Sequence, residues 1–360
     1  MKNEKIEHII SAFLPGENIQ EVHPLGEGFI NDTYIVKSCG GVRYVLQKKN
    51  SYIFRDVPRM MDNIMKVTSF IKKNALLKGL DPKRSTLTVV ETIDGHPYFF
   101  FDDEYWVLTE FIEQSVVYQK ADSDRLSFMG GCGVGSFLSS MSTFEEELYE
   151  TIPGFHNMRF RFEQFSSSID ANPVDRVKEV RNQIDTILSY KDEAMSLWEK
   201  FEQGIIPHRV SHNDTKLSNI LFDSKDNVLC MIDLDTVMSS MALNDFGDSI
   251  RSYANLSAED ERDLKKVEFS LSRFEAFTKG YLLQTRDVLS CQEKANLAFS
   301  ALYITLEQAL RFLMDYIDGD KYYKISYPEH NLVRTNAQLA LLSNMKLRYQ
   351  DMALIVEKYA

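Results

Sequence analysis

The residues best suited to chemistry lie in one stretch, between positions 209 and 233. His212, Asp214 and Asn219 form the pattern His-x-Asp-x-x-x-x-Asn, and an Ile-Asp pair follows that ends at Asp233. Two carboxylates and an amide offer oxygen donors, which Mg²⁺ prefers when phosphate oxygens and water complete its coordination. Phosphoryl transfer needs such a metal, together with an aspartate that accepts the proton of an attacking hydroxyl.

The elements around this stretch must bring its side chains together. Two short apolar runs, 220–222 and 228–232, flank a polar turn at 223–227, so the sequence predicts a β-hairpin. Asn219 enters this hairpin and Asp233 leaves it. We therefore expect the two side chains to return toward each other and toward Asp214.

The pattern of the chain changes near residue 109. Before it, Met60, Ile64, Val67 and Ile71 predict one helix with an apolar face. Alternating segments predict an antiparallel sheet with strands at 33–36, 42–47, 87–91, 98–101 and 105–110. After residue 120 we expect helices at 124–143, 166–169, 174–204, 257–285, 291–316 and 335–359, with Ser257 as an N-cap.

These elements predict an α+β protein of two lobes. We expect an N-terminal lobe at 1–108, a connecting segment at 109–113 and a helical C-terminal lobe at 114–360. A run of glycines at 130–135 resembles a dinucleotide-binding loop, but no strand precedes it. Close packing between helices is the better interpretation.

Composition excludes several classes of protein. Among 360 residues, 41 Lys and Arg face 53 Asp and Glu, which gives a net charge of -12 and argues against nucleic acid or an anionic membrane as the main partner. No apolar run approaches the roughly 18 residues that span a bilayer. The N-terminus lacks the pattern of an export signal. We therefore expect a cytoplasmic protein. Four widely separated cysteines predict neither a zinc site nor a disulfide framework.

The catalytic pattern and its hairpin resemble the core of the aminoglycoside phosphotransferase and choline kinase superfamily, which shares the bilobal protein-kinase fold. Further segments are similar to the bacterial N-acetylhexosamine 1-kinases: GEGFINDTY at 26–34, RYVLQ at 43–47, IDLDT at 232–236, DFGDS at 245–249 and YPEHNLVR at 327–334. The resemblance covers nearly the whole chain. It implies an enzyme dependent on ATP and Mg²⁺ that phosphorylates the anomeric 1-hydroxyl of N-acetylglucosamine or N-acetylgalactosamine.

The resemblance also implies that the lobe at 1–108 binds the nucleotide, that 109–113 is the hinge, and that the lobe at 114–360 carries the catalytic loop and the acceptor site. It further implies roles for matching positions. Asp214 would be the general base, while Asn219 and Asp233 would hold Mg²⁺. Lys216 would neutralise the moving phosphoryl group, although a solvated surface lysine is an equally good interpretation. His212 and Asp245 would support the catalytic loop. Asp235 is expected to point elsewhere or to cap a loop.

For the nucleotide, Gly26, Gly28 and Asn31 would present backbone amides to phosphates, with a simple hairpin turn as the alternative. Many relatives carry a lysine or arginine on the next strand that pairs with a helix glutamate. Here Gln47 stands at that position and Lys48 points to the opposite face. Backbone groups from Thr109 to Phe111 would bind an adenine edge, with a simple strand between the lobes as an equally good interpretation.

For the acceptor, Glu307, Arg311 and Asp315 are spaced by four and share one helix face. They would either converge on a small polar ligand or form a ladder of ion pairs. The resemblance implies Arg311 and Tyr327 as acceptor contacts, with Asp315 and Asp248 as weaker ones.

Two other functions remain open. A choline, ethanolamine or other alcohol kinase would need an aromatic cage, which Tyr316, Tyr322 and Tyr323 could form, although Arg311 opposes a cationic acceptor. A non-catalytic nucleotide-binding module is the alternative of another class, because Gln47 stands where a cation is usual. The oligomeric state is not predicted, and a monomer is plausible.

Overall fold

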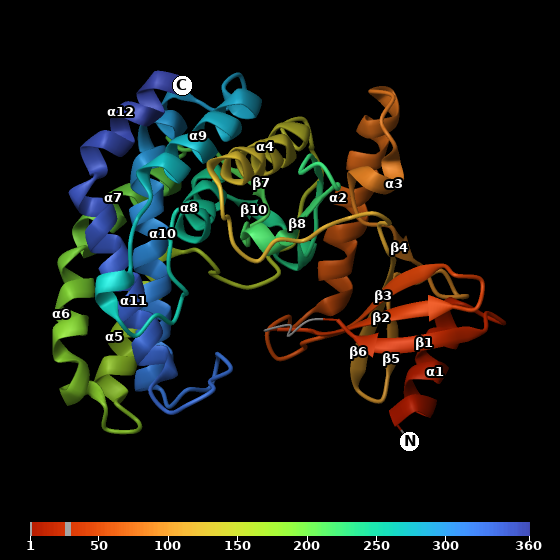
Figure 1. Cartoon of the computed structure of the whole chain (residues 1–360). Coiled ribbons are helices and arrows are strands. Elements are labelled where there is room, and N and C mark those ends of the chain that lie inside the picture. Colours follow the sequence, from red (N-terminus) through yellow and green to blue (C-terminus); the bar gives the residue numbers. More distant parts are fainter. Residues whose placement is uncertain (1, 26–29) are drawn as a thin grey trace. The chain divides into compact units, whose positions relative to one another are not determined.

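The computed structural model describes residues 2–25 and 30–360, and these residues form two compact units (Figure 1). The first unit consists of the described residues up to Ser115 together with Phe144–Pro153 and Ile232–Met238. The second consists of Val116–Thr143, Gly154–Met231 and Ser239–Ala360. The first unit therefore includes two segments that a single boundary at residues 109–113 does not foresee.

The first unit contains the predicted antiparallel sheet. Its strand order is β1-β2-β3-β6-β4, and β5 also pairs with β6. The strands are β1 (Ile19–Pro24), β2 (Asp32–Ser38), β3 (Arg43–Lys49), β4 (Val89–Val90), β5 (Phe99–Phe101) and β6 (Glu104–Glu110). All neighbouring strands run antiparallel. The connection between β3 and β4 is helical.

Helix α1 (Lys2–Phe13) covers one face of this sheet and was not expected from the sequence. Ile9, Ile10 and Phe13 recur at helical spacing and are buried against the sheet. Their partners in this core are Val36, Leu46, Trp106 and Leu108. Burial of each such side chain stabilises the fold by about 1.5–3 kcal/mol, so α1 is part of the core of the unit.

Helix α2 (Val57–Leu77) ties the later segments into the first unit. It begins where the Asp56 side chain accepts a hydrogen bond from the Arg59 amide. The buried Asn63 donates to the carbonyl oxygens of Tyr149 at 2.8 Å and Val237 at 3.0 Å. Its own side-chain oxygen accepts from the Tyr149 amide. One α2 side chain, that of Asn63, therefore holds both segments. The short helix α3 (Pro82–Ser85) follows α2 in the chain.

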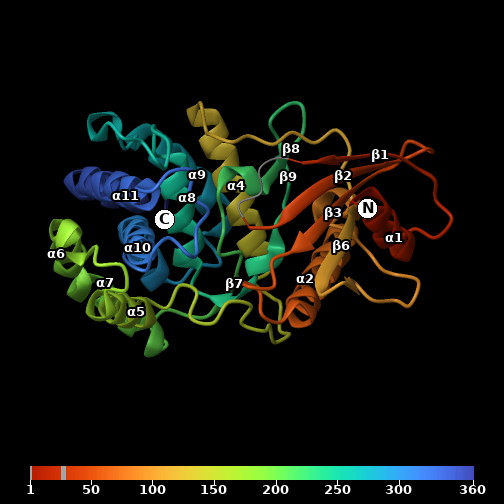
Figure 2. The same ribbon diagram turned by 90° about the horizontal axis from the view of Figure 1, so that it is seen from below.

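The second unit is mostly helical, as the sequence predicts. Its helices are α4 (Asp124–Ser140), α5 (Met158–Ala171), α6 (Arg181–Ser189), α7 (Lys191–Glu202), α8 (Ala242–Tyr253), α9 (Leu271–Thr285), α10 (Cys291–Ile317), α11 (His330–Leu347) and α12 (Tyr349–Tyr359), with 3-10 turns η1 (Val177–Val180), η2 (Leu217–Asn219) and η4 (Leu264–Lys266). Helix α10 packs against α5, α6, α8, α11 and α12 (Figures 1 and 2).

Helix α10 is a core element. It starts with a capping box between Ser290 and Glu293. By length and composition it is apolar enough to cross a membrane, whereas the sequence analysis found no such stretch. However, 83% of its most apolar window is buried inside the protein, as in the core helix of a soluble fold.

Helices α4 and α9 pack backbone to backbone. A Cβ atom at Gly131 would lie 2.2 Å from the carbonyl oxygen of Phe277, and one at Gly280 would lie 2.1 Å from that of Phe128. Only hydrogen fits at such positions. This confirms that the glycine run at 130–135 serves helix packing.

Several helices differ from the sequence prediction: the helix predicted at 174–204 is divided into η1, α6 and α7, and the one predicted at 166–169 is the longer α5. Helix α9 begins after Ser270, whose hydroxyl accepts from the Arg273 amide, and the predicted cap at Ser257 is wrong. The Ser257 hydroxyl donates to Asn255 instead. No α-helix begins at Ser257, because residues 258–266 are mostly charged and lack apolar helical spacing. Helix α8 was not expected, and the single helix predicted at 335–359 is divided between α11 and α12.

Candidate active site

Two predicted catalytic residues and one predicted metal ligand meet in the loop between β7 (Arg209–Ser211) and β8 (Ile220–Phe222). The carboxylate oxygen Oδ2 of Asp214 lies 3.0 Å from Nζ of Lys216. It also accepts a 3.0 Å hydrogen bond from Nδ2 of Asn219, which donates to the Asp214 carbonyl as well. The loop therefore brings together the predicted base, the lysine cation and the predicted amide ligand of Mg²⁺.

The electrostatics of this loop keep Asp214 ionised. Burial by itself raises the pKa of the Asp214 carboxyl, but the charges of Lys216 and His212 and the hydrogen bond from Asn219 bring that pKa below its usual value. The side chain is 24% exposed, so a ligand can reach it. An ionised, accessible carboxylate is able to accept a proton at neutral pH.

Asp245 on α8 holds the backbone just before this aspartate. Its Oδ2 accepts from the His212 amide at 2.9 Å and its Oδ1 accepts from the Asn213 amide at 2.7 Å. Asn213 has a left-handed conformation with φ of 64°, which an asparagine adopts more easily than most residues. Burial raises the pKa of Asp245 to about 6, although the nearby His212 and the two amides oppose that rise.

Asp248, a predicted acceptor contact, is engaged by the protein itself. Its Oδ2 accepts from the Thr215 amide at 2.9 Å, and its Oδ1 accepts from the guanidinium of Arg251. Both oxygens are therefore satisfied by the chain. This arrangement favours a role in holding the catalytic loop.

The predicted hairpin after the loop is confirmed. Strand β8 pairs with β9 (Val228–Met231), and Ile220 lies opposite Met231. Asp223 closes the turn by accepting from the backbone amides of Lys225 and Asn227. Asn219 thus comes one residue before a paired position. Asp233 follows the same pair by two residues but belongs to the first unit, so its convergence with Asp214 stays a prediction.

Two predicted nucleotide-binding residues of the first unit, Asn31 and Gln47, contact a buried ion pair. Nζ of Lys49 lies 2.7 Å from Oδ1 of Asp235 in the 3-10 turn η3 (Leu234–Thr236), and the two side chains are 2% and 5% exposed. Asn31 donates to Oδ2 of Asp235 at 2.8 Å, and Gln47 accepts from Lys49 at 2.8 Å. Asn31 and Gln47 are therefore fixed by a pair that the sequence analysis did not identify.

The alternation of β3 explains how Lys49 reaches this position. Lys49 and Gln47 share one face of the strand, while Lys48 lies on the other face and pairs with Asp32 at 2.9 Å. The expectation that Lys48 points to the opposite face is thus correct. Gln47, however, has a cation beside it, because Lys49 donates to its side chain. Gly26 and Gly28 lie outside the described residues.

The predicted adenine-binding backbone is partly engaged. Thr109 in β6 lies opposite Val45 on one side and Val89 on the other. The Phe111 amide donates to the Arg43 carbonyl at 3.0 Å. A purine edge would therefore need other backbone groups of this segment, such as the Phe111 carbonyl, as its partners.

The three polar residues of α10 turn to different partners and do not form a ladder. Glu307 binds His156 at 2.8 Å and lies 3.5 Å from Arg161. Asp315 accepts from the amides of residues 321, 322 and 323 and from Asn331. Its two oxygens are thus occupied in holding the segment after α10, which favours a structural role over contact with an acceptor.

Arg311 is buried among aromatic rings. Its guanidinium carbon lies 5.1 Å from the ring centre of Phe155 and 5.7 Å from those of Tyr322 and Tyr323. The side chain is only 8% exposed. Its hydrogen bonds, to Gln308 and Tyr322, are both 3.5 Å long. Among the described residues, no carboxylate lies within ion-pair distance of it.

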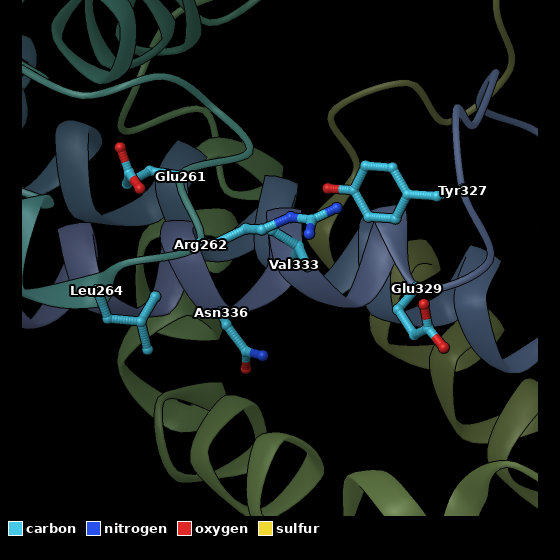
Figure 3. Close-up of a pocket in the computed structure, with 7 residues that line it drawn as sticks. All are labelled: Glu261, Arg262, Leu264, Tyr327, Glu329, Val333 and Asn336. Carbon is cyan, nitrogen blue, oxygen red and sulfur yellow. The ribbon is translucent and has the colours of Figure 1, made fainter.

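Tyr327 lies in a cavity of about 260 Å³ at the start of α11 (Figure 3). The residues that line it are Glu261, Arg262, Leu264, Tyr327, Glu329, Val333 and Asn336. Figure 3 shows the side chains of Arg262 and Tyr327 pointing toward each other, and the guanidinium carbon lies 4.3 Å from the ring centre. The Tyr327 ring also stacks on His330. The predicted acceptor contacts Arg311 and Tyr327 thus have different surroundings.

Comparison with known proteins identifies the family. Residues 21–277, more than half of the chain, match the model of a family described as the phosphotransferase enzyme family. The chain belongs to this phosphotransferase enzyme family. The match confirms the predicted superfamily and enzyme class, a phosphotransferase with an alcohol group as acceptor.

Solved structures of other phosphotransferases share the fold of this one. The microcompartment-associated aminopropanol kinase is 14% identical, with a TM-score of 0.64 over 98% of this chain and 99% of that one. The choline kinase of Cryptosporidium parvum Iowa II is 15% identical, with a TM-score of 0.58 over 99% of both chains. Amicoumacin kinase in complex with AMP-PNP, Ca²⁺ and Ami is 14% identical, with a TM-score of 0.55 over 98% and 94%. The α+β fold with an antiparallel N-terminal sheet and a helical C-terminal part is confirmed.

Sequence reasoning missed the contacts that three residues make with predicted site residues or with the loop before Asp214. Lys49 lies one alternation beyond Gln47, so a longer predicted strand would have included it. Asp235, which the sequence analysis expected to point elsewhere or to cap a loop, lies in a 3-10 turn and pairs with Lys49. His156, which contacts both Glu307 and the Asn213 carbonyl, lies in a segment without regular structure and carries no local signal.

Proposed function

We propose that this phosphotransferase moves the γ-phosphoryl group of ATP to the anomeric 1-hydroxyl of N-acetylglucosamine or N-acetylgalactosamine and releases the sugar 1-phosphate. The observation that supports this best is the buried Arg311, which contacts three aromatic rings and has only long hydrogen bonds. Sugar sites combine polar groups for hydroxyls and amides with an aromatic surface for the ring. A guanidinium in need of an acceptor suits the carbonyl of an acetamido group.

The position of this cluster relative to the base supports the same acceptor. Glu307 precedes Arg311 by one turn of α10 and binds His156. The other ring nitrogen of His156 lies 3.3 Å from the carbonyl oxygen of Asn213, the residue before Asp214. The arginine and the base are thus joined by a short series of contacts within the second unit.

The reaction assigns a task to each residue of the catalytic loop. Asp214, ionised at neutral pH, accepts the proton of the 1-hydroxyl as its oxygen attacks phosphorus. Lys216 lies 3.0 Å from Asp214 and neutralises the negative charge of the transferred phosphoryl group. His212 and Asp245 hold the loop through backbone hydrogen bonds. Mg²⁺ and ATP, when bound, supply the phosphoryl group and neutralise its charge.

The residues present fit these ligands. The described hydrogen bonds of the Asn219 side chain use its nitrogen, so its oxygen is available to a cation, and we propose Asp233 as the second protein ligand of that cation. Oxygen donors of this kind suit Mg²⁺. In the first unit we propose that Lys49, held by Asp235, supplies positive charge to the nucleotide phosphates together with Asn31 and Gln47.

A choline or ethanolamine kinase is the second candidate, since Tyr322 and Tyr323 offer aromatic faces of the kind that bind ammonium groups. Here the guanidinium of Arg311 already lies near these faces and would repel a cationic acceptor. The alternative of a non-catalytic module was motivated by Gln47 without a cation, and the buried Lys49 removes that motive. We further propose a cytoplasmic location, with ATP and a small sugar as partners.

The deciding experiment measures ADP release with ATP and Mg²⁺ across a panel of acceptors. The panel contains both N-acetylhexosamines, glucose, choline, ethanolamine and an aminoglycoside. We expect turnover with the N-acetylhexosamines, and phosphorus NMR should show an anomeric phosphate. The methyl glycoside of N-acetylglucosamine is the matched control, because its 1-oxygen carries no proton. Turnover of the methyl glycoside, or preference for choline, would overturn the proposal.

A further inference from the structure

His156 and Glu307 form a buried pair that the reaction above does not use directly. Nδ1 of His156 lies 2.8 Å from Oε2 of Glu307, and their side chains are 7% and 1% exposed. On the other side of the ring, Nε2 of His156 lies 3.3 Å from the carbonyl oxygen of Asn213. A carboxylate and a carbonyl are both acceptors, so the protonated imidazole satisfies both and the neutral ring satisfies only one.

The Asn213 backbone is held from both of its polar ends. Its amide donates to Asp245 at 2.7 Å, and its carbonyl oxygen faces His156. Between these two contacts the residue keeps its left-handed conformation. Such a conformation in a residue other than glycine persists when the surroundings over-determine it. The orientation of the next residue, Asp214, depends on this peptide unit.

The remaining contacts fix His156 itself. The ring packs on Phe155, whose carbonyl oxygen accepts two hydrogen bonds from Arg161. The positive charges of His156, Arg161 and Arg311 outweigh the effect of burial and lower the pKa of Glu307. An ionised Glu307 is thus available to orient the ring, and it stands on α10 four residues before Arg311.

We propose that His156, oriented by Glu307, is a positioning residue that holds the Asn213 to Asp214 peptide unit and thereby couples the region around Arg311 to the base. The identity of the acceptor in this proposal rests on the proposed function, whereas the contact between His156 and Asn213 does not. Misplacement of a reacting group by about 1 Å reduces turnover by about 10²-fold. Loss of the contact should therefore lower kcat and leave nucleotide binding intact.

The test compares His156→Phe, which removes both ring nitrogens, with His156→Gln, which retains a donor toward Asn213. Hydrogen exchange of the backbone amides of residues 212–215 in the full chain measures how firmly the loop is held, with no sugar present. We expect exchange at least about 10-fold faster in His156→Phe and closer to wild type in His156→Gln, with kcat lowered about 10–100-fold in the former and the KM for ATP within about 2-fold. Glu307→Gln keeps an acceptor for the ring and should have an intermediate effect on both measurements. It replaces His156→Phe as the test variant if the latter fails to fold.

The control variant is Thr305→Val on the same helix, because its buried hydroxyl binds the Ala301 carbonyl and does not touch the loop. It should leave exchange of residues 212–215 unchanged. Wild-type exchange in His156→Phe, or in Glu307→Gln if the former does not fold, would overturn the positioning role. If the wild type turns over no N-acetylhexosamine, the proposed function fails, while the exchange measurement still decides the role of His156.

Discussion

Lys49 on β3 and Asp235 in η3 are 186 positions apart in the chain, yet their side chains form a buried ion pair with Nζ and Oδ1 separated by 2.7 Å. Removal of one partner from such a pair leaves a buried charge without compensation, which costs about 3–5 kcal/mol. The pair also orders Asn31 and Gln47. It therefore joins the stability of the first unit to the proposed nucleotide site.

Replacement of Lys49 by Met separates these two roles. We expect Lys49→Met to lower the free energy of unfolding by about 3–5 kcal/mol and to weaken ATP binding by at least about 10-fold. In the double variant Lys49→Met/Asp235→Asn no buried charge remains, so much of the stability should return while nucleotide affinity does not. Chemical denaturation and calorimetry measure the two effects. Wild-type ATP affinity in the double variant would contradict a phosphate-binding role.

Asp214→Asn tests the base. The amide cannot accept a proton, but it retains an oxygen for the hydrogen bond from Asn219. We expect phosphoryl transfer to fall by about 10²–10⁴-fold, while the dissociation constant for ATP changes little. Rapid-quench measurement of product and calorimetry with ATP check this. Turnover close to that of the wild type would show that another group removes the proton.

Arg311→Met tests the acceptor site. The change keeps much of the side-chain volume and removes the guanidinium, so hydrogen bonds worth about 1.5–3 kcal/mol to a bound sugar should be lost. That corresponds to about 10–100-fold in kcat/KM for the N-acetylhexosamine. The KM for ATP serves as the internal control. An unchanged kcat/KM would place the acceptor elsewhere, for example at the cavity beside Tyr327.

Asp245 predicts how activity depends on pH. Its carboxylate accepts from two backbone amides, and its pKa is raised to about 6 in the folded protein. As the pH falls through about 6, protonation removes an acceptor from the loop, so kcat should decrease. The folded state binds this proton more tightly than the unfolded chain does, so between about pH 6 and pH 4 this group adds stability as the pH falls. Parallel profiles of kcat and melting temperature from pH 5 to 8 test the divergence. In Asp245→Asn the inflection near pH 6 should disappear.

Gly131→Ala tests the contact between α4 and α9. The new methyl group would meet the Phe277 carbonyl at 2.2 Å, so one helix must shift, and overpacking of this kind costs about 1–3 kcal/mol. Gly40→Ala is the matched control, because a Cβ atom there has its nearest neighbour at 3.5 Å. Denaturant titrations should separate the two variants. Equal stability would mean that the helices separate without cost.

The parts of the site that the sequence predicts are those encoded locally. The loop from His212 to Asn219 and its hairpin follow from turn residues and apolar runs within about twenty positions. The pair of Lys49 with Asp235, and that of His156 with Glu307, join segments more than 150 residues apart in the chain, and no periodicity indicates such partners. Likewise, equal spacing places Glu307, Arg311 and Asp315 on one helix face, but it does not show that each turns to a different neighbour.

The discontinuity of the first unit has a consequence for biosynthesis. Asn63 and Lys49 find their partners in the segments that end at Pro153 and Met238. A nascent chain that has left the ribosome only as far as the end of the sheet therefore lacks the counter-charge of Lys49. Domains otherwise tend to fold in the order of synthesis, but the first unit cannot be complete until its last segment, Ile232–Met238, has emerged.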